Sequence, residues 1–167
     1  MQTYSLFILK PGFSKKKDEV LKLLDENGIK VEKIKESMLL RETIEYHYEE
    51  HLGKPFYDTL VDYMTTGDIK GLMKFHPSCV VMVVSSKCEK ENQEDFIVRS
   101  RKVVKEVLRP ALTFKREKFA FLSDEDFKEV TITANGVHAS DSPASARREI
   151  NNFFPGFFAD ENDNEME

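Results

Sequence analysis

The sequence predicts an α+β protein: a ferredoxin-like βαββαβ antiparallel sheet with covering helices and an extra helical hairpin. Two short apolar runs, residues 4–9 and 79–84, have the length and the branched and aromatic content of buried strands. Longer segments around them repeat apolar residues at helical spacing. The resulting order is strand, helix, strand, paired helices, strand, helix, strand, helix, and this order is typical of an α+β fold.

Length and composition indicate one globular domain. The chain has 167 residues, of which 40% are hydrophobic and 33% are charged, so it can bury a core. No apolar run is long enough to cross a membrane, and the N-terminus lacks the basic start of a signal peptide. Cys79 and Cys88 are too few for a disulfide framework, and Cys79 begins an apolar run, as a buried thiol would. We therefore expect a cytoplasmic protein without a membrane partner.

The first half of the chain contains a strand, a helix, a long strand and two paired helices. The strand at 4–9 stops before a Lys-Pro-Gly turn, and the amphipathic segment 15–27 closes at an Asn-Gly step, a common helix end. Residues 29–40 alternate imperfectly between apolar and polar side chains, which suits a long strand. The paired helices are predicted at 43–52 and 54–64. A turn at 65–68 and an inserted loop or short helix at 69–78 then lead to the second buried strand.

The second half contains a long helix at 95–108 and a concentration of basic residues. Two acidic residues oppose eight basic ones: Arg99, Arg101, Lys102, Lys105, Arg109, Lys115, Arg116 and Lys118. Such a face can hold a triphosphate through bidentate arginines. The alternatives are a nucleic-acid patch and, for most of these residues, a solvated helix face. An insertion at 120–128 then leads to a strand predicted at 129–133.

A histidine on a short polar loop directly precedes the last predicted helix. Ser142 is a good N-cap residue and Pro143 suits the first helical position, so we expect this helix over 143–154. The helix start offers free N–H groups and a positive dipole end, which favour an anion near His138. An imidazole there can act as a nucleophile when its other nitrogen donates to a fixed acceptor, and Glu149 is placed to be that acceptor. The alternative is an ordinary loop histidine beside a capped helix.

These residues also carry a resemblance to a known family. Asn-x-x-His-x-Ser-Asp-Ser at 135–142, followed by Ser-Ala-x-x-Glu-Ile at 145–150, resembles the active-site signature of the nucleoside diphosphate kinase family. The resemblance implies that His138 becomes a phosphohistidine and that Ser140 and Glu149 orient its ring. One departure lies inside the motif, where Ala139 replaces the usual glycine, and a backbone with positive φ would resist its methyl group.

The resemblance extends to residues that would bind the nucleotide. Lys10-Pro11 is similar to the end of the family's first strand, where the lysine lies in the active site, although Gly12 replaces the usual aspartate. The paired helices resemble a hairpin that closes over the nucleotide, which implies that Tyr48 approaches the histidine and that Phe56 stacks on the base. The alternative for these aromatic residues is a place in the core. The other implied contacts are Arg101 and Arg116 to phosphate, Ile132 to the second face of the base and Asn135 to the sugar. The family's phosphate-binding threonine has no clear match.

The resemblance implies an enzyme that transfers the terminal phosphate of a nucleoside triphosphate to a nucleoside diphosphate in two steps, through phosphohistidine at His138. Mg²⁺ is the implied cofactor, held mainly by the nucleotide phosphates, and the implied assembly is a homo-oligomer. We expect no nucleic-acid partner. The alternative function is a module of the same fold that binds nucleotide or assembles but has lost efficient catalysis. A further rival is a zinc hydrolase, because the segment His47-Tyr48-Glu49-Glu50-His51 fits the inverted zinc-protease pattern.

We expect the kinase-like domain to occupy residues 1–154 and an acidic tail to occupy residues 155–167. Residues 159–167 contain five acidic residues and no basic one, which equals the formal net charge of −5 for the whole chain. The rest of the chain is therefore close to neutral and need not repel an anionic substrate. The acidic composition of the tail is typical of solvated, mobile segments. Phe157 and Phe158 are placed to dock the start of the tail.

Overall fold

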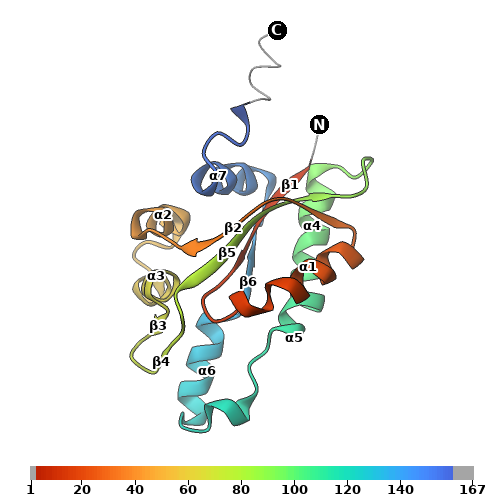
Figure 1. Cartoon of the computed structure of the whole chain (residues 1–167). Helices are drawn as coiled ribbons and strands as arrows, with labels where there is room; N and C mark the ends of the chain where they lie inside the picture. Colours follow the sequence, from red (N-terminus) through yellow and green to blue (C-terminus); the bar gives the residue numbers. More distant parts are fainter. Residues whose placement is uncertain (1–2, 160–167) are drawn as a thin grey trace.

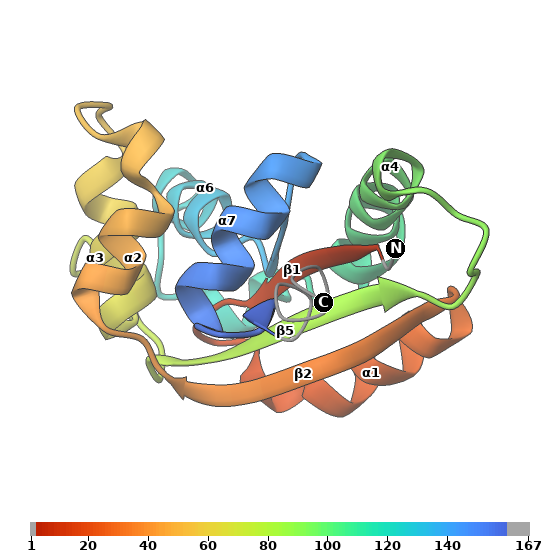
Figure 2. The same ribbon diagram turned by 90° about the horizontal axis from the view of Figure 1, so that it is seen from above.

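The computed structural model describes residues 3–159. It contains a four-stranded antiparallel sheet in the order β2-β5-β1-β6, built from Tyr4–Leu9 (β1), Ile29–Met38 (β2), Ser78–Ser86 (β5) and Val137–Ala139 (β6). Helix α1 (Lys17–Glu26) lies along β2, and α7 (Pro143–Phe153) lies against β1 (Figure 1; Figure 2). The predicted α+β fold is confirmed. No helix within residues 3–159 is both long and apolar enough to cross a membrane.

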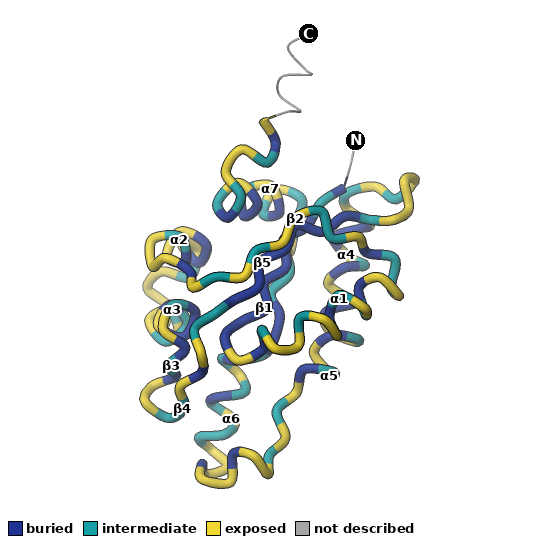
Figure 3. Tube along the Cα trace, in the orientation of Figure 1, coloured by how far each residue is buried: buried dark blue, intermediate teal, exposed yellow. Residues whose placement is uncertain are grey.

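The two central strands form the middle of the core. β1 and β5 are buried along nearly their whole length, as Figure 3 shows, because other elements cover both of their faces. Double coverage explains why both segments have continuous apolar runs in the sequence. The edge strand β2 is half exposed, and a register shift between Val31 and Lys33 interrupts its pairing with β5. This bulge accounts for the imperfect alternation of its side chains.

The predicted helical hairpin is present. Helix α2 (Arg41–His47) is followed by a 3-10 turn at Glu49–His51 and by α3 (Tyr57–Thr66), which packs against α2. α3 ends at Gly67, whose φ of +80° favours glycine and whose added Cβ would lie 2.0 Å from the Phe75 carbonyl oxygen. The next segment, expected as a loop or short helix, instead forms a small hairpin of β3 (Asp68–Ile69) and β4 (Met73–Lys74).

The region between residues 93 and 134 differs most from the sequence prediction. Helix α4 (Gln93–Val103) continues through a π-helical segment (Val104–Leu108) into α5 (Arg109–Ala111), and a 3-10 turn follows at Arg116–Phe119. The strand predicted at 129–133 is wrong, because these residues end helix α6 (Asp124–Thr133). The Ser123 side chain caps this helix by accepting from the Asp126 N–H, and three acidic residues in the first turn complement its dipole.

The fourth strand follows α6 as the three-residue strand β6. It pairs with β1, with Ile8 opposite His138, so the histidine expected on a loop lies on a strand. Helix α7 starts as predicted, because the Ser142 hydroxyl accepts from the Ser145 N–H and proline occupies the first turn. After α7, the rings of Phe157 and Phe158 pack on Tyr4. Residues 160–167 of the expected tail lie outside the described residues.

Candidate active site

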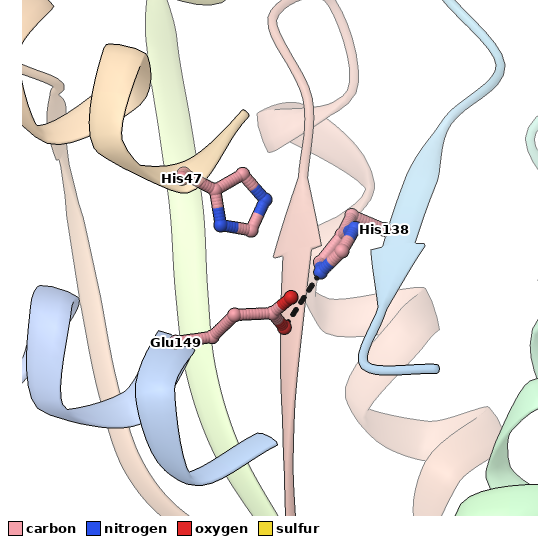
Figure 4. A group of neighbouring side chains, drawn as sticks. All are labelled: His47, His138 and Glu149. Carbon is pink, nitrogen blue, oxygen red and sulfur yellow. Dashed lines mark hydrogen bonds and ion pairs between the residues drawn. The ribbon is translucent and has the colours of Figure 1, made fainter. Parts of the chain in front are cut away.

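The ring of His138 is held by a glutamate on α7. His138 Nε2 lies 2.9 Å from Glu149 Oε1, and the glutamate is 6% exposed (Figure 4). Because a carboxylate only accepts, the hydrogen of the neutral imidazole is on Nε2, and Nδ1 keeps its lone pair. The acceptor and the ring are therefore in contact although they lie eleven residues apart in the sequence.

Ser140 ties this glutamate to the central sheet. Its hydroxyl donates to Glu149 Oε1 at 2.7 Å and accepts from the backbone N–H of Leu6 at 3.0 Å. Its own N–H donates to the Leu6 carbonyl at 3.1 Å, and its side chain is fully buried. The orientation of the imidazole is therefore fixed by a chain of hydrogen bonds that starts at the backbone of β1.

Lys10 lies at the end of β1, beside the loop that leads to β6. Its Nζ donates to Asn135 Oδ1 at 2.8 Å, and its backbone N–H donates to Gly136 at 2.9 Å. The lysine is 7% exposed. Burial, and then the charge of the Arg109 guanidinium, lower the pKa of Lys10 to about 8. The side chain therefore carries its positive charge at neutral pH and loses it in mildly alkaline solution.

A cavity of about 420 Å³ opens in front of His138 and Lys10. Its remaining basic lining comes from one helical stripe, at Arg101, Lys105 and Arg109, with Lys102 next to it. Two carboxylates, Glu106 and Asp141, also face the cavity. The excess of positive charge over negative charge suits a multiply charged anion.

The two arginines that the sequence singled out have different positions. Arg101 lines the cavity with His138. Arg116 does not line it: its guanidinium donates to the carbonyls of Phe119 at 2.6 Å and Leu122 at 2.7 Å, and pairs with Asp124. The second arginine of the cavity is Arg109, which sequence reasoning missed. The four-residue spacing of positions 101, 105 and 109 could have indicated Arg109, because side chains at i, i+4 and i+8 share one face of a helix.

The other predicted nucleotide contacts lie at varying distances from the cavity. Tyr48 is buried, and its ring packs edge-on against His47, which in turn contacts the ring of His138. Burial raises the pKa of the Tyr48 hydroxyl, so it stays protonated. Phe56 at the tip of the hairpin is 48% exposed; the His51 ring packs edge-on against it, and the Lys54 Nζ lies 6.0 Å from its ring centre. Ile132 is 65% exposed on α6 and is outside the cavity, because the strand expected to carry it is a helix.

His47 is a close neighbour of His138 that sequence reasoning considered only as a zinc-hydrolase residue. The centres of the two imidazole rings are 4.6 Å apart. His47 is 4% exposed, and neither of its nitrogens has a hydrogen-bond partner among the described residues. Burial, and then the neighbouring His138, hold its pKa well below the usual value, so the ring is neutral. Within residues 3–159, the metal-capable group at His47 includes neither Glu50 nor His51, so the inverted zinc-protease motif is not assembled.

Comparison with known proteins decides the family. The nucleoside diphosphate kinase family model matches residues 3–157. The chain belongs to the nucleoside diphosphate kinase family. It is 36% identical over 136 residues to the Archaeoglobus fulgidus nucleoside diphosphate kinase, covering 81% of this chain and 74% of that protein. It is 33% identical over 153 residues to the nucleoside diphosphate kinase of Campylobacter fetus, covering 90% and 93%.

Solved structures agree on the fold. The crystal structure of the Aquifex aeolicus nucleoside diphosphate kinase superposes with a TM-score of 0.63 over 93% of this chain and 97% of that one, at 22% identity. The enzyme of Encephalitozoon cuniculi superposes with a TM-score of 0.61 at 20% identity. At these identities the superpositions show that this chain shares the fold of the two solved structures.

Two departures from the family pattern have local explanations. Ala139 lies in β6 opposite Phe7, and the one non-glycine residue with positive φ within residues 3–159 is Lys70, so the methyl group meets no backbone strain. Gly12 has a φ of +97°, and a Cβ added there would lie 2.7 Å from the Phe75 ring. The loop after Lys10 in this member of the family therefore needs glycine, not the usual aspartate.

Proposed function

We propose that this chain transfers the terminal phosphate of a nucleoside triphosphate to a nucleoside diphosphate through a phosphohistidine at His138. The observation that carries the proposal is the His138–Glu149 hydrogen bond, which leaves Nδ1 with its lone pair beside a basic cavity. The family supports phosphate transfer between nucleotides, and its other members that this chain resembles are named for that activity.

The reaction consists of two displacements at the same nitrogen. In the first, His138 Nδ1 attacks the terminal phosphorus, the bond to the bridging oxygen breaks, and a nucleoside diphosphate leaves with that bond's electron pair. The ring becomes a phosphorylated imidazolium, whose charge the Glu149 carboxylate stabilises through Nε2. In the second displacement, another nucleoside diphosphate binds and its terminal oxygen attacks the same phosphorus. Nδ1 takes back its electron pair, so one cavity serves donor and acceptor in turn.

The cavity contributes mainly charge. Lys10, Arg101 and Arg109 offset the negative charge that spreads over the transferring oxygens, and positioning and electrostatics carry most of the catalysis of phosphoryl transfer. We assign the second phosphate-binding role to Arg109 in place of Arg116. Mg²⁺ held by the nucleotide phosphates would offset part of their negative charge, and Glu106 and Asp141 in the cavity lining would offer it further oxygen ligands.

The nucleoside is held by residues next to the cavity. The exposed ring of Phe56 offers a stacking face that accepts any base. Asn135, which already accepts from Lys10, is near enough to the phosphate site to bind the sugar hydroxyls. Tyr48 packs edge-on against His47, which in turn contacts the ring of His138. Ile132 is exposed on α6 and does not line the cavity with His138, and we assign it no role.

The proposal includes a homo-oligomer in the cytoplasm. The edge strand β2 and the residues after it expose three large apolar side chains, Ile34, Met38 and Leu40, which a second copy of the chain would cover. Both cysteines are free, in agreement with a reducing compartment. Sedimentation of the purified chain tests the assembly, and a monomer at micromolar concentration would contradict it.

The intact mass after brief incubation with ATP and Mg²⁺, followed by a chase with GDP, tests the function. We expect one added phosphate, acid-labile and base-stable, that GDP removes and that His138→Ala never acquires. Nucleotide binding without an added phosphate would instead support the catalytically weakened module. The presence of nucleophile, acceptor, lysine and basic cavity in one place favours the active kinase.

A further inference from the structure

Three side chains able to ligate a metal converge at the proposed nucleophile. A nitrogen of His47, a nitrogen of His138 and a carboxylate oxygen of Glu149 all lie within 4.8 Å of one another. Figure 4 shows them meeting from the end of α2, from β6 and from α7. Two imidazoles and one carboxylate are a ligand set that binds zinc in proteins while leaving a fourth position open.

His47 supplies an independent sign of a ligand. The residue is 4% exposed, and both of its ring nitrogens are buried without a hydrogen-bond partner among the described residues. A buried polar atom left without a partner costs about 1–3 kcal/mol, so such atoms in folded proteins need an explanation. The ring packs against Tyr48, His138 and Phe153, none of which satisfies its nitrogens. A metal ion between His47 and Glu149 would satisfy one of them.

We propose that His47, His138 and Glu149 bind a divalent transition metal, zinc above all, and that the bound metal blocks phosphate transfer. The blocking part rests on the proposed function, whereas metal binding does not. Tetrahedral zinc with bonds of about 2.0–2.1 Å separates its ligands by about 3.4 Å. His138 Nε2 and Glu149 Oε1 are 2.9 Å apart and would separate by about 0.5 Å, and the His47 nitrogen, within 4.8 Å of its partners, would move inward by at most about 1.4 Å.

The metal and the phosphate donor need opposite tautomers of His138. Attack on phosphorus requires the hydrogen on Nε2 and a lone pair on Nδ1, and a neutral imidazole has only one N–H. A metal on Nε2 therefore moves that hydrogen to Nδ1 and removes the attacking lone pair. The metal also occupies the Glu149 oxygen that would stabilise the imidazolium. Mg²⁺ prefers oxygen ligands and stays with the nucleotide, so the cofactor of the reaction does not fill the site.

Metal binding is tested first, on the full chain without nucleotide. Co²⁺ serves as the probe because tetrahedral coordination gives it a visible absorption, and Zn²⁺ is then added to displace it. We expect one Co²⁺ per chain for the wild type and binding weaker by about tenfold or more for His47→Gln. His51→Gln and His76→Gln are the matched controls, because neither residue belongs to the group, and both should bind Co²⁺ as the wild type does. Equal binding by His47→Gln and the wild type would overturn the proposal.

A second measurement keeps the test decisive if His47→Gln fails to fold. The chain has four histidines, so the ring-proton NMR signals of the wild type are few. Zn²⁺ should shift the signals of His47 and His138 and leave those of His51 and His76 in place. Shifts confined to His51 or His76 would refute the site.

The blocking step is read from the rate of phosphohistidine formation with ATP and Mg²⁺. Zn²⁺ should slow the wild type, a chelator should restore it, and His47→Gln should need about tenfold more Zn²⁺ for the same inhibition. Phosphohistidine formation that saturating Zn²⁺ leaves unchanged would refute the blocking. Co²⁺ binding by a wild type that never forms phosphohistidine would support the metal site and refute the proposed function, so the two failures are distinguishable.

Discussion

Replacing Glu149 with glutamine tests how the imidazole of His138 is activated. The carboxylate oxygen Oε1 accepts from His138 Nε2 at 2.9 Å and from Ser140 Oγ at 2.7 Å. An amide has the same shape and keeps one acceptor oxygen, so the ring keeps its orientation and its tautomer in the resting enzyme. The amide carries no charge, however. The imidazolium that forms as Nδ1 attacks phosphorus therefore loses its counter-ion.

The size of the effect follows from that lost charge. A hydrogen bond to a charged group contributes about 1.5–3 kcal/mol, and the neutral bond that the amide keeps contributes about 0.5–1.5 kcal/mol. The difference is about 1–1.5 kcal/mol, so at about 1.4 kcal/mol per factor of ten phosphohistidine formation should slow by about 5- to 12-fold. The KM for ATP should stay the same, because the positive charge on the ring exists in the transition state and not in the enzyme–substrate complex.

The assay mixes the protein rapidly with excess ATP and Mg²⁺, quenches in base, and follows the added phosphate by intact mass. Glu129→Gln is the control, because this glutamate lies on the surface of α6 in an exposed pair with Lys70 and should leave the rate unchanged. A Glu149→Gln protein that forms phosphohistidine at the wild-type rate would refute the reasoning. So would a loss that is confined to KM.

Three further predictions concern the cavity and the loops. Arg109→Gln should raise the KM for nucleotides about tenfold, because Arg109 lines the cavity. Arg116→Gln should leave KM unchanged and lower the free energy of unfolding by about 1–3 kcal/mol, because Arg116 holds the 119–124 turn. A change in KM for Arg116→Gln would contradict this assignment. The phosphorylation rate should fall as the pH rises through about 8, because Lys10, with its lowered pKa, loses its positive charge there. Lys10→Met should abolish that fall. A wild-type rate that stays flat across this pH range would contradict the role of the Lys10 charge. Gly67→Ala and Gly53→Ala should each lower the free energy of unfolding by about 1–2 kcal/mol, because both positions have positive φ. Gly67→Ala should lower it further, because its Cβ would lie 2.0 Å from the Phe75 carbonyl oxygen. Urea unfolding compares the two variants, and equal losses would contradict the close approach at Gly67.

Segments whose structure depends on their own residues were predictable from the sequence. β1 and β5 have apolar runs too short for helices and bounded by turn residues, and both are central strands. The start of α7 follows from Ser142 and Pro143, and the position of Glu149 on α7 then follows from helical geometry. The contact between His138 and Glu149 was predictable for that reason, because both residues flank a single capped helix start.

The errors arose where residues outside a segment decide its structure. Val130 and Ile132 alternate as in a strand, but the Ser123 cap and the acidic first turn determine a helix, and these signals precede the segment. β6 has three residues, and it is a strand because β1 offers it a free edge, which no local pattern reports. The π-helical segment before Arg109 was also invisible in the sequence, and it belongs to the helix whose side chains line the cavity.

Residues 99–128, where the resemblance to the family is weakest (the divergent region), are compatible with the proposed chemistry because charge and orientation have different requirements. The His138 ring must be oriented within a few tenths of an ångström, and the hydrogen bonds that do this start at Leu6 and pass through Ser140 and Glu149, all outside the divergent region. The cavity must supply positive charge, and Coulomb attraction falls only as the inverse of distance, so a basic side chain on another turn can supply it. Arg109 can therefore take the phosphate-binding role that the resemblance implied for Arg116. Substitutions along the Leu6–Ser140–Glu149 connection should accordingly lower the rate of transfer, whereas charge changes along the helical stripe should shift nucleotide affinity.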